Sequence, residues 1–167
     1  MDPLKRPCGT VLEAAKRQGY LTGMVVTAKV TDATPACFAS HVSDRQYENA
    51  IAEQLIGNGP LNRTVDVLFG GKLCSPPLTI YMESIDWGTG GLCHFVPRNE
   101  TGSCRLDDLD LLSLAKERGF TFLTDRDALE SFNSNLSLPA LGLFSPRVRA
   151  PPSPSPNVNN AAHVLLH

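Results

Sequence analysis

Apolar residues recur along this chain in short runs whose spacing switches between that of a helix and that of a strand. Val11, Leu12 and Ala15 share one face of a helix predicted over residues 9–19. A continuous apolar run at residues 24–26 predicts a buried strand within residues 20–30. The same patterns predict further helices at residues 35–41, 44–56, 106–118 and 125–132, and further strands at residues 65–69, 120–123 and 138–144.

Helices that alternate with strands are typical of a parallel sheet covered on both faces. The sequence therefore predicts an α/β fold, a partial doubly wound and mostly parallel sheet with three αβα layers, over residues 9–144. Residues 72–90 show neither helical nor strand spacing, and the chain becomes rich in proline and then asparagine after Ser145. We expect a disordered insertion at residues 72–90 and a Pro-rich disordered tail at residues 145–167.

Composition and charge narrow the possible functions. The 167 residues are 42% hydrophobic and 19% charged, which is typical of one modest globular domain. The formal net charge of -2 provides no basic field, so we expect no nucleic-acid partner. No apolar run approaches the roughly 18 residues that a membrane-spanning helix needs, and residues 1–8 do not resemble a secretory signal.

The five cysteines form an odd set without CxxC spacing, which argues against a zinc knuckle or a thioredoxin-like site. Cys93 and Cys104 flank a loop-like stretch, and this placement fits either a disulfide or two free thiols. Cys37 is interpreted as a small apolar residue on a helix face. Three glycosylation sequons favour a secretory history of the chain; they begin at Asn62, Asn99 and Asn135.

The candidate chemistry follows the first predicted strand, since parallel sheets bind ligands at the carboxyl ends of their strands. Asp32 and Thr34 offer carboxylate and hydroxyl oxygens, which suit Mg²⁺ directly or through its waters. Arg45, one short helix later, offers a planar guanidinium that can grip two phosphate oxygens. These residues indicate phosphate handling. From the residues alone, a helix capped by Thr34 and a solvated arginine explain this pattern more simply, without a ligand.

An ordered series of motifs resembles the alkaline phosphatase family, and most closely its fungal, vacuolar-type members. The motifs are GTVLEAA at residues 9–15, YLTG at 20–23, TDATPA at 31–36, HVSDR at 41–45, IAEQ at 51–54, VDVLFGG at 65–71, GLCHFVP at 91–97 and LPALGLF at 138–144. Removal of residues 72–90 would join Gly70-Gly71 to Gly91 and restore the family's triple-glycine motif. We therefore interpret that stretch as foreign to the family.

The resemblance implies a role for each candidate residue. Thr34 matches a magnesium ligand, Asp32 matches a position that holds magnesium-bound water, and Arg45 matches the arginine that clamps the substrate phosphate. In the complete family enzyme a serine attacks a phosphomonoester to form a phosphoseryl intermediate, with Zn²⁺ and Mg²⁺ as cofactors. The family also implies a homodimer that is vacuolar, secreted or anchored to a membrane by an N-terminal segment we do not find here.

Key groups of that enzyme fall outside this chain. The family's nucleophilic serine lies upstream of Gly9, and most of its metal ligands lie downstream of Phe144. We therefore expect a truncated alkaline phosphatase that is inactive alone and retains neither Mg²⁺ nor Zn²⁺. The alternative function is a non-catalytic interaction module that exposes the Pro-rich tail. A third possibility, an unrelated α/β phosphate-binding protein, is disfavoured by the ordered motifs.

Several other polar residues have an interpretation that needs no ligand. His41 is interpreted as a helix residue near the site rather than a metal ligand, and His94 is assigned no ligand role. An acidic cluster at the start of the helix predicted over residues 106–118 is expected to interact with the helix dipole; its members are Asp107, Asp108 and Asp110.

Overall fold

The computed structural model describes residues 8–71, 91–124, 126–132, 137–144 and 162–166. The expected insertion at residues 72–90 and most of the expected tail lie outside these ranges, so their disorder stays a prediction. Among the described residues, none of the helices has both the length and the apolar character that crossing a membrane requires.

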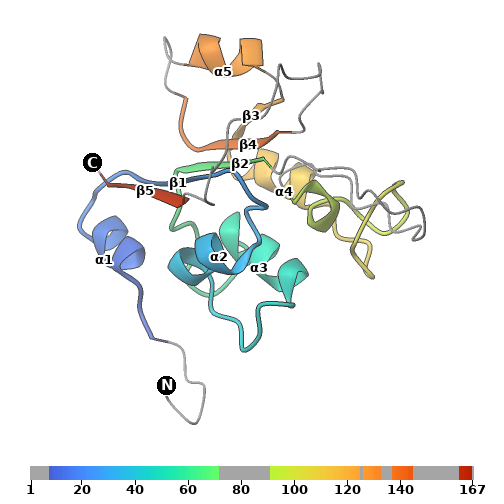
Figure 1. Ribbon diagram of the computed structural model, residues 1–167, viewed down its shortest axis with the longest axis horizontal. Helices are drawn as coiled ribbons and strands as arrows, with labels where there is room; N and C mark the ends of the chain where they lie inside the picture. Colours follow the sequence, from blue (N-terminus) through green and yellow to red (C-terminus); the bar gives the residue numbers. More distant parts are fainter. Residues whose placement is uncertain (1–7, 72–90, 125, 133–136, 145–161, 167) are drawn as a thin grey trace, which may run out of the picture.

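A five-stranded sheet in the order β3-β4-β2-β1-β5 forms the centre of the molecule (Figure 1). Four of its strands run parallel, namely β1 (Thr22–Val26), β2 (Val67–Gly71), β3 (Thr121–Leu123) and β4 (Ala140–Phe144). The register sets Met24 beside Leu68 and Leu68 beside Leu141. All three of these side chains are buried. The predicted mostly parallel α/β sheet is thus confirmed.

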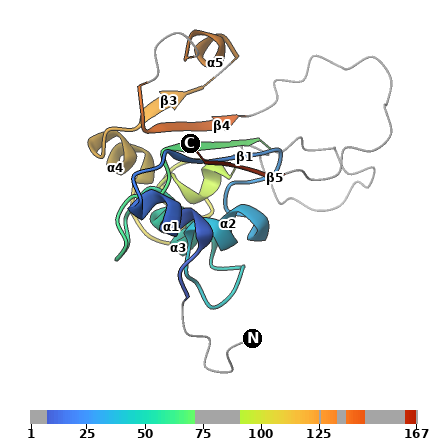
Figure 2. The same cartoon turned by 90° about the vertical axis from the view of Figure 1, so that its left-hand side faces the viewer.

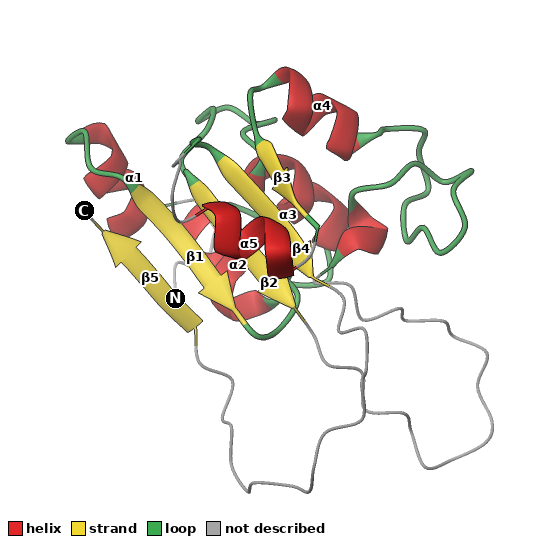
Figure 3. Cartoon of the chain, turned by 90° about the horizontal axis from the view of Figure 1, so that it is seen from above, coloured by secondary structure: helices red, strands yellow, loops and turns green. Residues whose placement is uncertain are grey.

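The fifth strand, β5 (Ala162–Leu166), pairs antiparallel with β1 and sets Thr22 opposite Leu166. Figure 3 shows it at the edge of the sheet beside β1. The sequence analysis assigned these residues to a disordered tail, and the strand differs from that expectation. Five residues after a Pro-rich stretch carry little periodicity of their own. What organises them is the otherwise unpaired edge of β1.

The helices occupy both sides of the sheet. They are α1 (Val11–Arg17), α2 (Ala33–Ala39), α3 (Glu48–Leu55), α4 (Leu111–Glu117) and α5 (Arg126–Phe132), with a 3₁₀ turn η1 (Leu92–His94). Figures 1 and 2 show α1, α2 and α3 on one face of the sheet and α5 on the other. The three-layer arrangement agrees with the fold predicted from the sequence. Fully buried side chains from these helices fill the core, among them Leu12, Ile51, Leu55 and Leu111.

Helix starts depart from the predicted boundaries for local reasons. Asp32 is the N-cap residue of α2, so Thr34 lies inside the first turn and is not the cap that the sequence suggested. Helix α3 begins at Glu48 instead of residue 44. The preceding segment instead forms a turn, in which the side chain of Asp44 accepts the amide of Gln46 at 2.9 Å. An aspartate that binds a backbone amide two residues on competes with the helix.

The three carboxylates of the acidic cluster contact different partners. Helix α4 begins at Leu111 because Asp110 caps it, accepting the Ser113 amide at 3.0 Å. Asp107 pairs instead with Arg105, and Asp108 pairs with Arg98 at 2.8 Å. The expectation that all three carboxylates interact with the helix dipole is therefore wrong for Asp107 and Asp108.

Candidate functional site

The three predicted site residues lie on segments that follow the carboxyl end of β1. Asp32 is half-buried at the start of α2, and its side chain makes no capping hydrogen bond. Thr34 is exposed in the first turn of the same helix. Arg45 is exposed in the turn between α2 and α3. All three residues therefore belong to the connection that joins β1 to α3.

A hydrogen bond between Thr31 and Glu48 links the starts of α2 and α3. The Thr31 hydroxyl donates to Oε2 of Glu48 at 2.5 Å. Asp32 directly follows Thr31, and Arg45 precedes Glu48 by three residues. Helices α2 and α3 lie on the same face of the sheet (Figure 1). Across the described part of the chain, no hydrogen bond or ion pair links the side chains of the three candidates to one another; these are Asp32, Thr34 and Arg45.

Glu48 is the centre of the polar contacts at this edge of the sheet. Its Oε1 also accepts a hydrogen bond from Nζ of Lys29 at 2.8 Å, and its Oε2 lies 3.0 Å from Nε2 of His94. Burial alone would raise the pKa of Glu48, but the hydrogen bonds from His94, Lys29 and Thr31 outweigh it and lower the pKa to about 2. Glu48 is thus ionised at neutral pH and fixes both Thr31 and Lys29.

The turn η1 packs against the start of α3. Gly91 precedes it with a φ of 99°, and a Cβ at this position would lie 3.3 Å from Oγ1 of Thr31. Glycine suits this left-handed conformation and this close approach. The turn directs His94 toward α3, where Nδ1 of its ring lies 2.8 Å from Oδ1 of Asn49.

Arg105 joins η1 to α3 from below the surface, with a side chain that is 0% exposed. It donates to Asp107 at 2.6 Å, to Glu53 at 2.9 Å and to the carbonyl of His94 at 3.1 Å. Burial would lower the pKa of Arg105, but its carboxylate partners raise it, so the guanidinium stays charged. We call this set the Glu48–Arg105 network; its members are Lys29, Thr31, Glu48, Asn49, Glu53, His94, Arg105 and Asp107.

The cysteines resolve the alternatives left by the sequence. Cys93 and Cys104 form a disulfide, which confirms the first of the two possibilities. Cys37 lies on α2 as expected but is exposed, and its thiol donates to the carbonyl of Thr34 at 3.0 Å. The interpretation of Cys37 as an apolar helix-face residue is therefore wrong, because that position faces solvent.

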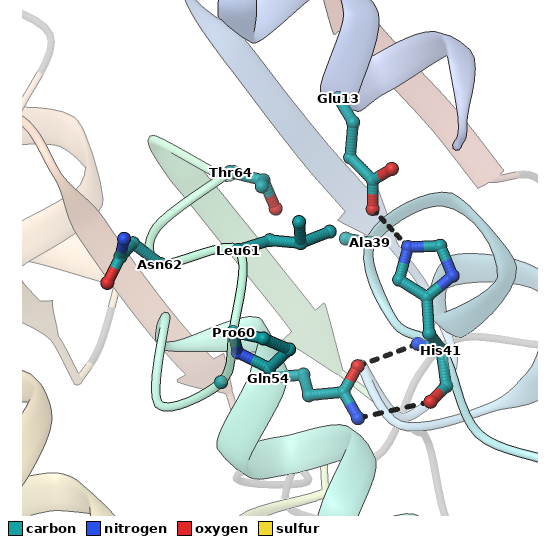
Figure 4. A pocket seen from close by; sticks show the side chains of 9 residues that line it. Glu13, Ala39, His41, Gln54, Pro60, Leu61, Asn62 and Thr64 are labelled. Carbon is teal, nitrogen blue, oxygen red and sulfur yellow. Dashed lines mark hydrogen bonds and ion pairs between the residues drawn. The ribbon is translucent and has the colours of Figure 1, made fainter. Parts of the chain in front are cut away.

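His41 lies in a small pocket at the far end of α2 from Asp32 (Figure 4). Its Nε2 lies 2.6 Å from Oε1 of Glu13, and its amide donates to Oε1 of Gln54 at 2.7 Å. Seven helical residues separate this pocket from Thr31, about 10 Å along the helix axis. His41 follows the helix rather than lying in it, and it connects α1 with α3.

The polar network was missed by the sequence analysis. Glu48 and Arg105 were assigned no role, and His94 was explicitly set aside. Charged residues on predicted helices are usually solvated, so nothing in their spacing separates them from surface charges. The one usable signal was the placement of His94 directly after Cys93 and of Arg105 directly after Cys104.

Two of the three sequons are described by the structure. Asn62 is exposed and has a left-handed backbone with φ 57°, and Asn99 is exposed in the loop between η1 and α4. Asn135 lies outside the described residues. Glycosylation at these positions stays a prediction.

The sequence of the chain is similar to the sequences of alkaline phosphatases. The alkaline phosphatase family model matches residues 1–149. The alkaline phosphatase of Schizosaccharomyces pombe is 49% identical over 142 residues, which are 84% of this chain and 23% of that protein. The repressible alkaline phosphatase of Saccharomyces cerevisiae is 43% identical over 155 residues, covering 87% of this chain and 24% of that protein.

A bacterial phosphatase that is named for one substrate also matches. The streptomycin-6-phosphate phosphatase of Streptomyces griseus is 31% identical over 159 residues, which are 84% of this chain and 29% of that protein. The chain thus spans about a quarter of the length of the curated relatives it matches.

Proposed function

Because the chain belongs to the alkaline phosphatase family, we propose that it carries the magnesium and substrate-phosphate side of a phosphomonoester hydrolase site. In this proposal Thr34 is a direct ligand of Mg²⁺, and Asp32 holds a magnesium-bound water. Arg45 binds two oxygens of the substrate phosphate through its guanidinium. The proposal concerns the site to which these residues contribute, and the substrate class is that of the family.

The observation that supports the proposal most is the hydrogen bond between Thr31 and Glu48. It ties the residue before Asp32 to the first residue of α3, so the turn that bears Arg45 ends beside the start of α2. Arg45 precedes Glu48 by three residues, which span at most about 10 Å of extended chain. An arginine side chain that reached back over this distance could meet a phosphate bound to the metal ion. A hydroxyl, a carboxylate and a guanidinium thus originate at one edge of the sheet.

The chemistry of the donors fits Mg²⁺, which prefers oxygen ligands and keeps several of its waters. The bound ion would add positive charge beside the phosphate. The exposed guanidinium of Arg45 orients the phosphate and stabilises negative charge that develops on its oxygens. The Glu48–Arg105 network holds the backbone that carries these groups.

We further propose that the chain is inactive by itself. One direct ligand and one water-mediated ligand do not hold Mg²⁺ against solvent, and Zn²⁺ needs about three protein ligands. The attacking serine and the zinc ligands of the family enzyme would lie in the parts of its relatives that this chain does not span. The Pro-rich tail, on which the alternative of an interaction module depends, lies outside the described residues.

Two measurements on the purified chain test this proposal. With the disulfide intact, we expect no release of p-nitrophenol from p-nitrophenyl phosphate above the buffer rate. We also expect neither Zn²⁺ nor Mg²⁺ in stoichiometric amounts by elemental analysis. Hydrolysis that purifies with the chain and is lost in Arg45→Ala would contradict the inactivity and retain the assignment of Arg45.

A hybrid enzyme tests the assigned residues directly. Residues 9–71 joined to 91–144 would replace the matching segment of the Schizosaccharomyces pombe alkaline phosphatase. In an active hybrid, Arg45→Ala should lower kcat/KM by about 10²-fold, because a charged donor to the transferring phosphoryl group is removed. Gln46→Ala changes the next exposed residue and serves as the matched control. Equal activity of the two variants would exclude Arg45 from phosphate binding.

A further inference from the structure

The disulfide is part of a cluster that also contains an imidazole. One ligand atom from each of Cys93, His94 and Cys104 lies within 4.8 Å of the other two. We propose that these three residues form a redox-gated Zn²⁺ site, which is closed by the disulfide and opens when the disulfide is reduced. The site shares no residue with Asp32, Thr34 or Arg45, and it does not rest on the function proposed above.

The ligand set is one that Zn²⁺ prefers. Two thiolates and one imidazole provide three of the four ligands of a tetrahedral zinc centre, and water would take the fourth position. Two thiolates also balance the charge of the ion, so the loaded site adds no net charge to a partly buried location. Cys93 and His94 are 7% and 9% exposed, whereas Cys104 is exposed and leaves a path for the ion.

The surroundings of His94 resemble those of a metal-bound histidine. Its Nε2 lies 3.0 Å from Oε2 of Glu48, and its Nδ1 lies 2.8 Å from Oδ1 of Asn49. In this proposal Zn²⁺ binds Nδ1 in place of Asn49, and Nε2 keeps the Glu48 carboxylate as its partner on α3. Such a second partner orients a ligating imidazole and raises its basicity.

The cluster has supports that do not depend on the sulfur–sulfur bond. The amide of Cys104 donates to the carbonyl of Cys93 at 2.8 Å, and Arg105 donates to the carbonyl of His94 at 3.1 Å. The hydroxyl of Ser103 donates to the carbonyl of Val96 at 2.8 Å. These contacts keep both cysteines beside His94 after reduction, so the reduced site is pre-organised.

The redox step balances with a dithiol as the reductant. The dithiol gives two electrons and two protons to the Cys93–Cys104 bond and becomes a disulfide itself, which leaves two thiols on the chain. Zn²⁺ then displaces the two thiol protons and binds the thiolates. The sequence analysis argued against a zinc knuckle because the five cysteines lack CxxC spacing. The fold removes that objection, because the loop after Cys93 turns back and places Cys104 beside Cys93.

The experiment compares the oxidised and reduced states of one protein. A full-length chain with Cys8, Cys37 and Cys74 replaced by serine retains only Cys93 and Cys104. Half is reduced with dithiothreitol, which is then removed under nitrogen, and both halves are titrated with Zn²⁺ against a chromogenic chelator. We expect one more Zn²⁺ per chain in the reduced half, and a thiolate-to-cobalt absorption when Co²⁺ replaces Zn²⁺. Equal zinc uptake by the two halves would overturn the proposal.

Two carboxylate variants separate an oriented site from an adventitious pair of thiols. Glu48→Gln removes the charge beside His94 and should weaken zinc binding by about 10- to 100-fold. Glu117→Gln, at an exposed position on α4, is the control with unchanged affinity. Equal zinc affinities of the two variants would overturn the role of His94. The far-UV circular dichroism of the two halves is compared first, because an unfolded chain with two free thiols would also bind Zn²⁺.

Discussion

Two groups of polar residues follow β1, and they are built differently. The Glu48–Arg105 network surrounds the buried side chains of Thr31, His94 and Arg105, and its charged members have charged partners within 3.0 Å. Asp32, Thr34 and Arg45 lie on the same connection but are half-buried or exposed. Within the described residues, no hydrogen bond or ion pair engages the side chain of Arg45.

The difference separates residues that stabilise the fold from residues available to a ligand. A buried charge without partners costs several kcal/mol, so the members of the network satisfy one another. The exposed candidates have water as their partner and can exchange it for phosphate or a metal ion at small cost. The network should therefore dominate stability, and the candidates should hardly affect it.

The largest expected effect is that of Arg105→Ala. It leaves Glu53 and two backbone carbonyls without their buried donor, and it should lower the free energy of unfolding by about 3 kcal/mol. Arg98→Ala is the control, because the Arg98–Asp108 pair is 61% and 72% exposed and should contribute less than about 1 kcal/mol. Urea denaturation of both variants gives the comparison. Similar losses in the free energy of unfolding would mean that the burial of Arg105 does not make it more important for stability than Arg98.

Removal of the disulfide should have the next largest effect. Cys93 and Cys104 are 11 residues apart, and a closed loop of that size contributes about 2 to 3 kcal/mol by restricting the unfolded chain. The Cys93→Ala, Cys104→Ala double variant should lose this amount in urea denaturation without zinc. Cys37→Ala alters an exposed free thiol and should leave the midpoint unchanged. An unaltered midpoint for the double variant would show that backbone contacts alone hold the loop.

The acid dependence of stability should report on Glu48. Its pKa falls from the ordinary 4.5 to about 2 on folding, so its contribution is fully present above pH 4.5 and is lost as the pH falls toward 2. Solvent reaches the side chain, which is 21% exposed, so we expect about 1 to 2 kcal/mol over this window. Glu48→Gln should flatten that part of the stability profile, and Glu117→Gln, at an exposed position, should not. Parallel profiles for the two variants would remove Glu48 from the centre of the network.

The smallest expected effect is that of Arg45→Ala on stability. An exposed side chain on a turn contributes less than about 0.5 kcal/mol, so the unfolding midpoint should stay where it is. The same change should lower catalysis in the hybrid enzyme, and this contrast would mark Arg45 as a ligand-binding residue. A clear loss of stability would instead assign Arg45 to the fold.

Most of the fold was predictable because short-range patterns agree with the tertiary structure. The apolar run at residues 24–26 and the helical spacing of Val11, Leu12 and Ala15 each fall on the predicted element. The boundaries were less predictable. Asp44 forms a turn in place of a helical start, and Asp110 moves the start of α4 to Leu111. Such choices depend on which backbone amide a short polar side chain reaches.

The candidate site divides in the same way. Asp32, Thr34 and Arg45 were proposed because their types and order match a known family, and their roles stay predictions. Glu48, His94 and Arg105 were not found, because their significance arises from contacts between segments distant in the sequence. Arg105 reaches Asn49 and Glu53 across more than 50 positions, and no local pattern encodes that distance.

The pairing of β5 with β1 joins the last described strand to the first. Every other neighbour of β1 in the sheet comes from within the first 71 residues, whereas β5 comes from residues 162–166. Closing so long a loop costs only slightly more entropy than closing a short one, but the pairing must wait until residues 162–166 have been synthesised. The amides of β1 that face β5 should therefore gain protection from hydrogen exchange last. Their protection would report when residues 162–166 have joined the sheet.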